Sequence, residues 1–221
     1  MLDTTWLTAT AHAQLIAVFV ANVAFLLNSK SGRKEFLFLG LLLFITLSSE
    51  VAGFVGGFIY RKNMNQVYNI VLLFVIPLFL SHYKTKISSQ RTIYLVNVGL
   101  ILFVIFGVVD LFFIQKELSM TMYTRQLGNI LMILISIQYF YLLLKELPTQ
   151  SITRLPMFWI NAAVLIYYSG TFFQYLTADY LVQVSNINFV NIWTIHNFLG
   201  TIYYLMLAYS LWVNRSTVTA S

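Results

Sequence analysis

Cysteine is absent from this chain of 221 residues, and charged residues are scarce. Without cysteine there can be no disulfide, no thiolate nucleophile, no iron–sulfur cluster and no cysteine-ligated zinc site. Charged residues make up 9% of the chain and hydrophobic residues 59%, whereas soluble domains carry about 25% charged residues. So few polar side chains could not cover the core of a soluble fold of this size. The composition therefore predicts an integral membrane protein.

The N-terminal segment lacks the basic residues of a secretory signal. It carries Asp3 and no lysine or arginine before Lys30, whereas a cleavable signal peptide begins with a positively charged region. We therefore expect the first apolar stretch to stay in the mature protein. The net charge of +6 is not taken as a sign of nucleic-acid binding, because basic residues in membrane proteins mostly mark cytoplasmic loops.

Seven apolar stretches have lengths close to the roughly 20 residues that a helix needs to span a bilayer. They predict an all-α integral membrane protein, a seven-transmembrane-helix bundle that forms one domain over residues 1–221. The links between them are too short and polar to hold a soluble domain. The predicted helices cover residues 10–27, 36–60, 67–83, 92–114, 122–144, 156–176 and 190–213.

Basic residues predict the orientation, because lysine and arginine are enriched in cytoplasmic loops. Nine of the thirteen fall on one side of the predicted bundle and four on the other. This bias places the N-terminus outside and the C-terminus in the cytoplasm. The nine are Lys30, Arg33, Lys34, Lys84, Lys86, Arg91, Lys145, Arg154 and Arg215. The four are Arg61, Lys62, Lys116 and Arg125.

Ionisable and amide side chains within membrane spans are costly, so each one is a candidate for function. In the predicted orientation, seven of them lie in the outer half of five helices. They predict a ligand-binding pocket that opens to the outside, although each group could instead be satisfied separately by a neighbouring helix. The seven residues are Glu50, Asp110, Arg125, Asn129, Gln174, His196 and Asn197.

Two further patterns concern the charged members of this set. Asp110 and Arg125 are nearly mirror-related about the intervening loop, which predicts a salt bridge between two antiparallel helices, either structural or ligand-binding. Glu50 lies at the edge of a small-residue face formed by Ser49, Gly53 and Gly57. Such a face lets another helix approach closely, so Glu50 is expected to point into the bundle.

Several chemistries are not supported. A retinal pigment needs a lysine within the seventh helix, and every lysine lies in a loop or at a span end. The three histidines, His12, His82 and His196, lie on different predicted helices, which disfavours haem and intramembrane zinc hydrolysis. No nucleotide-binding glycine motif is present. We therefore expect no catalytic residue, no metal and no cofactor.

Three segments carry a resemblance to a known group: NQVYNIVLLFVIPLFLSHY, FWINAAVLIYYSGTFFQYL and WTIHNFLGTIYYLMLAYSLW. They resemble small seven-helix membrane proteins of Bacteroidota, whose genes often lie near those of two-component signalling systems. The resemblance implies a bacterial inner-membrane location and a link to signalling. Relatives often have a glutamate in the third helix where this chain reads NIVLLFVIP, so no role of that acid carries over.

Four functions remain open. The first is a sensory or signalling component with an outward-facing polar pocket, an unknown small-molecule ligand and output through a partner protein. The second is a small-molecule or proton-coupled transporter, which would need polar groups that continue into the inner half. The third, an intramembrane enzyme, is disfavoured by the missing ligand clusters. The fourth is a structural subunit of a membrane assembly. In all four, membrane lipids surround the chain, and no nucleic-acid partner is expected.

Overall fold

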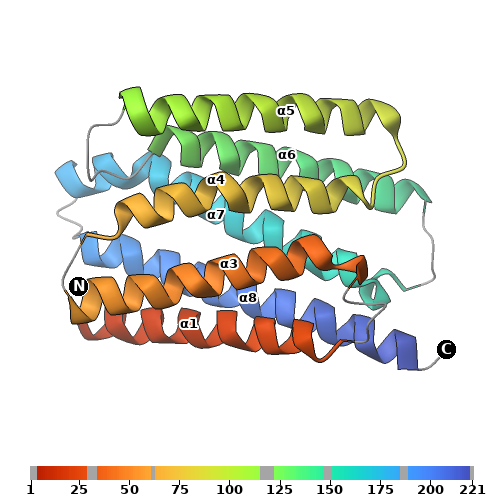
Figure 1. Cartoon of the computed structure of the whole chain (residues 1–221), viewed down its shortest axis with the longest axis horizontal. Helices are drawn as coiled ribbons and strands as arrows, with labels where there is room; N and C mark the ends of the chain where they lie inside the picture. The colour runs from red at the N-terminus through yellow and green to blue at the C-terminus, as the bar shows by residue number, and fades with distance from the viewer. Residues whose placement is uncertain are drawn as a thin grey trace. The chain divides into compact units, whose positions relative to one another are not determined.

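The computed structural model describes residues 4–28, 34–60, 63–114, 122–146, 151–184 and 189–219. Within these ranges the chain is helical, without strands (Figure 1). The seven long helices are α1 (Thr4–Leu26), α3 (Leu37–Gly53), α4 (Asn65–Lys84), α5 (Gln90–Val109), α6 (Met122–Glu146), α7 (Pro156–Val184) and α8 (Phe189–Thr219). The short segments are the π-helices η1 (Phe54–Ile59) and η2 (Asp110–Ile114) and the 3-10 helix η3 (Ile152–Arg154). For the described residues, the prediction of an all-α chain with seven helices is confirmed.

Several helices are longer than the apolar stretches that predicted them. Helix α1 begins at Thr4 instead of near residue 10, and α7 and α8 continue to Val184 and Thr219 instead of ending near residues 176 and 213. In each case the helix extends through polar residues beyond the apolar run. Hydrophobicity marks the part of a helix that suits lipid, whereas backbone hydrogen bonding continues until a breaker or a cap ends it.

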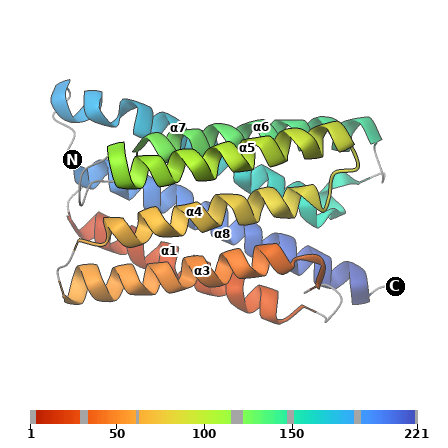
Figure 2. The ribbon, with the colours of Figure 1, turned by 45° about the horizontal axis from the view of Figure 1, so that its top comes forward.

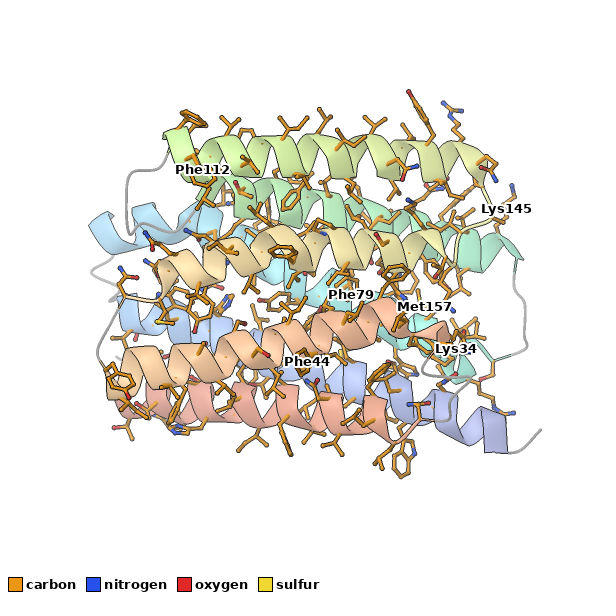
Figure 3. The ribbon with its side chains drawn as sticks, in the orientation of Figure 1. Lys34, Phe44, Phe79, Phe112, Lys145 and Met157 are labelled. Carbon is orange, nitrogen blue, oxygen red and sulfur yellow. The ribbon has the colours of Figure 1, made fainter. Side chains whose placement is uncertain are left out.

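Five helices of the described part are long and apolar enough to cross a membrane, in the segments 5–26, 37–57, 65–84, 90–114 and 123–145. Their outer surfaces carry large apolar side chains such as Phe44 and Phe112, which are 66% and 72% exposed (Figure 3). Soluble proteins rarely expose large contiguous apolar patches. These features are typical of a multi-pass membrane protein. Helices α7 and α8, with 29 and 31 residues, are long enough to span but are not among these five.

The chain divides into two compact units. Residues 1–35 and 136–221 form one of them, here called the terminal unit, and residues 36–135 form the other, here called the central unit. Helix α6 contributes residues 122–135 to the central unit and residues 136–146 to the terminal unit. Each unit is described by itself.

In the terminal unit, α1 packs along α8 (Figure 2). A Cβ atom at Gly200 would collide with the Gln14 side chain, so glycine permits a close approach there. Towards the other end of α1, the Asn28 side chain donates to the Leu211 carbonyl oxygen at 3.2 Å and accepts from the Asn214 amide at 3.0 Å. Residue numbers rise together in these contacts, so α1 and α8 run parallel.

Helix α7 runs antiparallel to α8 and to the terminal unit's part of α6. The ring of Trp159 lies 4.8 Å from that of Tyr209, and Tyr167 stacks on Tyr203 at 4.6 Å between ring centroids. Ser136 of α6 donates to the Asn161 carbonyl oxygen at 3.1 Å, and the Asn161 amide donates back to the Ser136 carbonyl oxygen at 3.0 Å. This buried reciprocal pair fixes α6 against α7.

The central unit is built on close contacts at glycines. A Cβ atom at Gly53 of α3 would collide with the Tyr68 phenol of α4, and one at Gly107 of α5 would collide with Leu73 of α4. Gly128 of α6 lies against Phe103 of α5. These contacts make α3 antiparallel to α4 and α5 antiparallel to α6. Small residues are the usual means by which helices approach closely in membranes.

Basic residues gather at one end of each unit. In the terminal unit, Lys34 and Lys145 lie towards the end at which α1 and α8 finish (Figure 3). In the central unit, Lys84, Lys86 and Arg91 flank the junction of α4 and α5. In each unit, most of the polar residues predicted for function lie nearer the opposite end. Lys30, Arg33, Arg61, Lys62 and Lys116 lie outside the described residues.

Candidate functional site

The seven predicted site residues are divided between the two units. Glu50, Asp110, Arg125 and Asn129 belong to the central unit, and Gln174, His196 and Asn197 belong to the terminal unit. Within each unit the structure brings some of them together with side chains that the sequence did not single out. A single pocket shared by all seven stays a prediction.

His196 of α8 lies between two tyrosines of α7. Its Nε2 atom is 3.5 Å from the Tyr167 hydroxyl, and its Nδ1 atom is 3.4 Å from the Tyr175 hydroxyl. The two tyrosines are eight positions apart in the sequence, so they lie on the same face of α7 about two turns from each other. Trp193, almost one turn earlier on α8, meets the His196 ring edge-on at 5.2 Å between centroids. The three aromatic rings and His196 are here called the histidine cage.

The histidine cage can accommodate either charge state of the imidazole. A neutral ring has one donor and one acceptor nitrogen, so one phenol accepts a hydrogen bond and the other donates. A protonated ring donates from both nitrogens, and both phenol oxygens must then accept. Protonation thus reverses one hydrogen bond and requires one phenol hydroxyl to turn. Charge-assisted hydrogen bonds are shorter and stronger than neutral ones, so both long contacts would tighten around an imidazolium.

The other two predicted residues of the terminal unit play different parts. Gln174 lies on the seam between α7 and α8 and donates to the Ile192 carbonyl oxygen at 2.6 Å. Asn197 is buried and precedes Gly200 by three positions, so it lies on the α8 face that meets α1. Neighbouring residues of a helix point about 100° apart, so His196 and Asn197 face different helices.

Asp110 does not pair with Arg125, and the predicted salt bridge is wrong. The Asp110 carboxylate is fully buried, and its Oδ2 atom accepts from the Thr124 backbone nitrogen at 3.1 Å and from the Thr124 hydroxyl at 2.6 Å. Thr124 lies in the first turn of α6, where backbone N–H groups have no partner within the helix and the helix dipole favours negative charge. The start of α6 therefore takes the place of a cation at one oxygen of this carboxylate, while the Oδ1 atom is buried without a hydrogen-bond partner among the described residues.

Arg125 turns away from Asp110 because it follows Thr124 by one position, or about 100° of helix. It faces α4, where its guanidinium donates to the Asn69 side-chain oxygen at 3.4 Å. The neighbouring Tyr68 phenol interacts electrostatically with both Glu50 and Arg125. Glu50 and Arg125, two of the predicted residues, are thus both close enough to this phenol to act on it electrostatically.

Sequence reasoning missed the residues that complete these two groups. None of Tyr68, Asn69, Thr124, Tyr175 and Trp193 was predicted as a site residue. The spacing of Tyr167 and Tyr175 was a usable signal, because it places two phenols on one helix face. The partnership of Asp110 with Thr124 had no such signal, since it depends on how α5 meets the start of α6.

No cluster of three or more metal-ligating side chains occurs among the residues that the structure describes. No protein-family model, curated protein or solved structure matches this chain. A functional interpretation therefore depends on the geometry of the side chains themselves.

Proposed function

We propose that this protein is a sensory component of the bacterial cytoplasmic membrane, with seven transmembrane helices, that responds to conditions outside the cell and acts through a partner protein. The histidine cage carries the proposal. It couples a side chain that can titrate near neutral pH to the packing of α7 against α8. Protonation changes the hydrogen bonds that join these two helices, and a change in their packing is a signal that a partner can detect.

The packing of α7 and α8 supports seven spans. Helix α1 is one of the five apolar helices, and α8 runs parallel to it from the contact of Gln14 with Gly200 to that of Asn28 with Asn214. A helix that follows a membrane span over this length must cross the same thickness of lipid. Helix α7 in turn follows α8 from Gln174 to Trp159. Both helices direct polar groups towards neighbouring helices, so these groups need not face lipid.

The orientation follows from the ends at which the basic residues gather. In each unit the lysines and arginines of the described loops lie at the end proposed to be cytoplasmic, as the positive-inside rule requires. The histidine cage lies near the beginning of α8, towards the other end of the terminal unit. In this orientation the cage is close to the outer surface.

A reporter that is active only in the cytoplasm, fused after Ser221, is expected to give a signal. The same reporter placed before Met1 should be silent, because the N-terminus is outside. Activity of a periplasmic reporter at Ser221 would reverse the orientation and place the histidine cage on the cytoplasmic side.

A sensor fits the polar groups better than a transporter does. A transport path needs polar groups that continue towards the cytoplasmic end. Nearer that end of the terminal unit, two pairs of buried polar side chains bond across helices, which holds the helices together. These groups are Ser136 with Asn161, and Asn28 with Asn214.

The fluorescence of Trp193 is expected to fall as the pH is lowered from about 8 to 5, the range in which histidine side chains titrate. The indole lies 5.2 Å from the His196 ring, and a protonated imidazole quenches indole fluorescence more strongly than a neutral one. The measurement uses purified protein in nanodiscs, with the other three tryptophans replaced by phenylalanine.

His196→Gln should abolish this pH dependence, and His12→Gln should leave it intact. His12 is a matched control, since it is an exposed histidine on α1 that contacts the Thr8 carbonyl oxygen in its own helix. A pH dependence that persists in His196→Gln would remove the histidine cage as the sensing element.

A further inference from the structure

Two buried hydrogen-bond donors on one face of α6 have no partner among the residues that the structure describes. The Nε atom of Arg125 and the side-chain nitrogen of Asn129 are both buried, and no described residue accepts a hydrogen bond from either. Asn129 itself is only 6% exposed. The two residues are four positions apart, which places them on the same side of the helix one turn from each other. Buried hydrogen-bond donors in proteins are nearly always satisfied. A pair of unsatisfied donors therefore indicates that a bound group supplies the acceptor.

Helices α3 and α4 present groups of complementary character to Arg125. Asn69 offers its oxygen to the guanidinium, and Asn69 is 3% exposed. The Tyr68 phenol is seated where a side chain at Gly53 would otherwise lie, and Glu50 is one turn from Gly53 on α3. The phenol is also within electrostatic range of both Glu50 and Arg125, so an acidic and a basic side chain lie in the same neighbourhood.

The helix backbone is irregular at the same end of the central unit. The π-helix η1 directly follows α3, close to Glu50, and the π-helix η2 begins at Asp110, beside the start of α6. Segments of π-helix are rare and are frequently found at functional sites. Two of them at one end of one unit are an observation independent of the unpaired donors.

We propose that this group, here called the Arg125 site, binds a small zwitterion. The oxyanion accepts hydrogen bonds from Arg125 and Asn129, and the ammonium group lies towards Glu50 and the Tyr68 hydroxyl. An arginine with a neighbouring amide donor is well suited to a carboxylate or phosphate, and a carboxylate suits an ammonium. Two sources share this chemistry, a free amino acid and the headgroup of phosphatidylethanolamine.

The proposal goes beyond the histidine cage and deepens the proposed sensory function, which requires a ligand or condition outside the cell. Arg125 and Tyr68 lie in the first turns of α6 and α4, so the Arg125 site is near the surface of the unit. In the proposed orientation this surface is the outer one. Binding can be measured without that orientation, because both faces of a nanodisc are in contact with water.

The test is saturation-transfer NMR with glycine on the full chain in nanodiscs of phosphatidylglycerol, a lipid without an ammonium group. Saturable binding of glycine is expected, with weaker binding of acetate and of methylamine, each of which lacks one of the two charges. Arg125→Gln and Asn129→Leu should each lower the affinity for glycine about tenfold, which is the effect of losing one hydrogen bond to a charged group. Glu50→Gln should lower the affinity for glycine. The affinity for acetate, which has no ammonium group, should stay the same or increase.

Arg91→Gln is the matched control for the loss of a positive charge, because Arg91 is exposed near the start of α5 at the other end of the same unit. If Arg125→Gln does not fold, Asn129→Leu carries the test. Loss of glycine binding in nanodiscs that contain phosphatidylethanolamine would identify the lipid headgroup as the bound zwitterion. Unchanged glycine binding there would identify a free amino acid.

The proposal is overturned by any of three results. These are the absence of saturable binding by glycine, equal binding of glycine and acetate that is insensitive to Glu50→Gln, or binding that persists in both α6 variants. None of these results bears on the pH dependence of Trp193 fluorescence, so the Arg125 site and the proposed sensory function fail separately.

Discussion

Asp110→Ala is expected to lower the free energy of unfolding by roughly 2–4 kcal/mol, since each hydrogen bond to a charged group contributes about 1.5–3 kcal/mol. The carboxylate is fully buried and accepts two hydrogen bonds from Thr124. Its removal leaves a backbone N–H at the start of α6 without an acceptor, in a position where the helix itself cannot provide one. Unfolding in mixed detergent micelles, followed by circular dichroism, measures the loss.

Double-mutant cycles identify the partner of Asp110. Asp110→Ala combined with Thr124→Val should show a coupling of about 1 kcal/mol, because the two side chains form a hydrogen bond. Asp110→Ala combined with Arg125→Gln should be close to additive. Coupling to Arg125 without coupling to Thr124 would contradict the structure and restore the salt bridge that the sequence predicts.

The predicted salt bridge is wrong because the depth of two charged residues in the membrane does not determine whether their side chains pair. The mirror spacing of Asp110 and Arg125 placed them correctly near one end of two antiparallel helices. Depth, however, leaves open the direction in which each side chain points. A rotation of 100° per residue brings Thr124 to α5 and sends Arg125 to α4. The start of α6 offers Asp110 an N–H donor that a count of side-chain charges does not include.

The number of helices could be predicted from the sequence because each one contains an apolar stretch close to the roughly 20 residues of a membrane span, although only five of the described helices are long and apolar enough to cross. The ends of α7 and α8 could not, since helical hydrogen bonding extends beyond the apolar segment in both. The small-residue face of α3 was also only partly informative. Ser49 and Gly53 are buried, as expected for a packed face. What fills the space at Gly53 is a phenol from α4, and no feature of α3 alone could identify it.

The sequence predicted which polar residues are energetically costly within a membrane span, but not how their side chains are arranged around one another. Glu50, Arg125 and His196 were selected because charge within a span is costly. The groups that hold them are mostly tyrosines and asparagines, which are common in membrane helices for other reasons. A tyrosine has a polar tip on an apolar ring, so a hydropathy pattern does not distinguish it from other residues of a span. Which groups its hydroxyl contacts depends on how the helices pack.

Gly53→Ala is expected to destabilise the protein by about 1–3 kcal/mol, the usual effect of overpacking a well-packed interface. A Cβ atom at this position would collide with the Tyr68 hydroxyl and crowd the ring behind it. The measurement is again the free energy of unfolding in mixed micelles.

Gly57→Ala provides the matched control for the same substitution four residues later. No atom of the described residues lies within 4 Å of the position that its Cβ would occupy, so alanine there should be neutral or stabilising by up to about 1 kcal/mol through the lower entropy of the unfolded chain. In a Tyr68→Ala background, Gly53→Ala should cost little as well, because the colliding ring is gone. If Gly53→Ala were as harmless as Gly57→Ala with Tyr68 in place, the phenol would not be seated on α3, and its part in the Arg125 site would have to be abandoned.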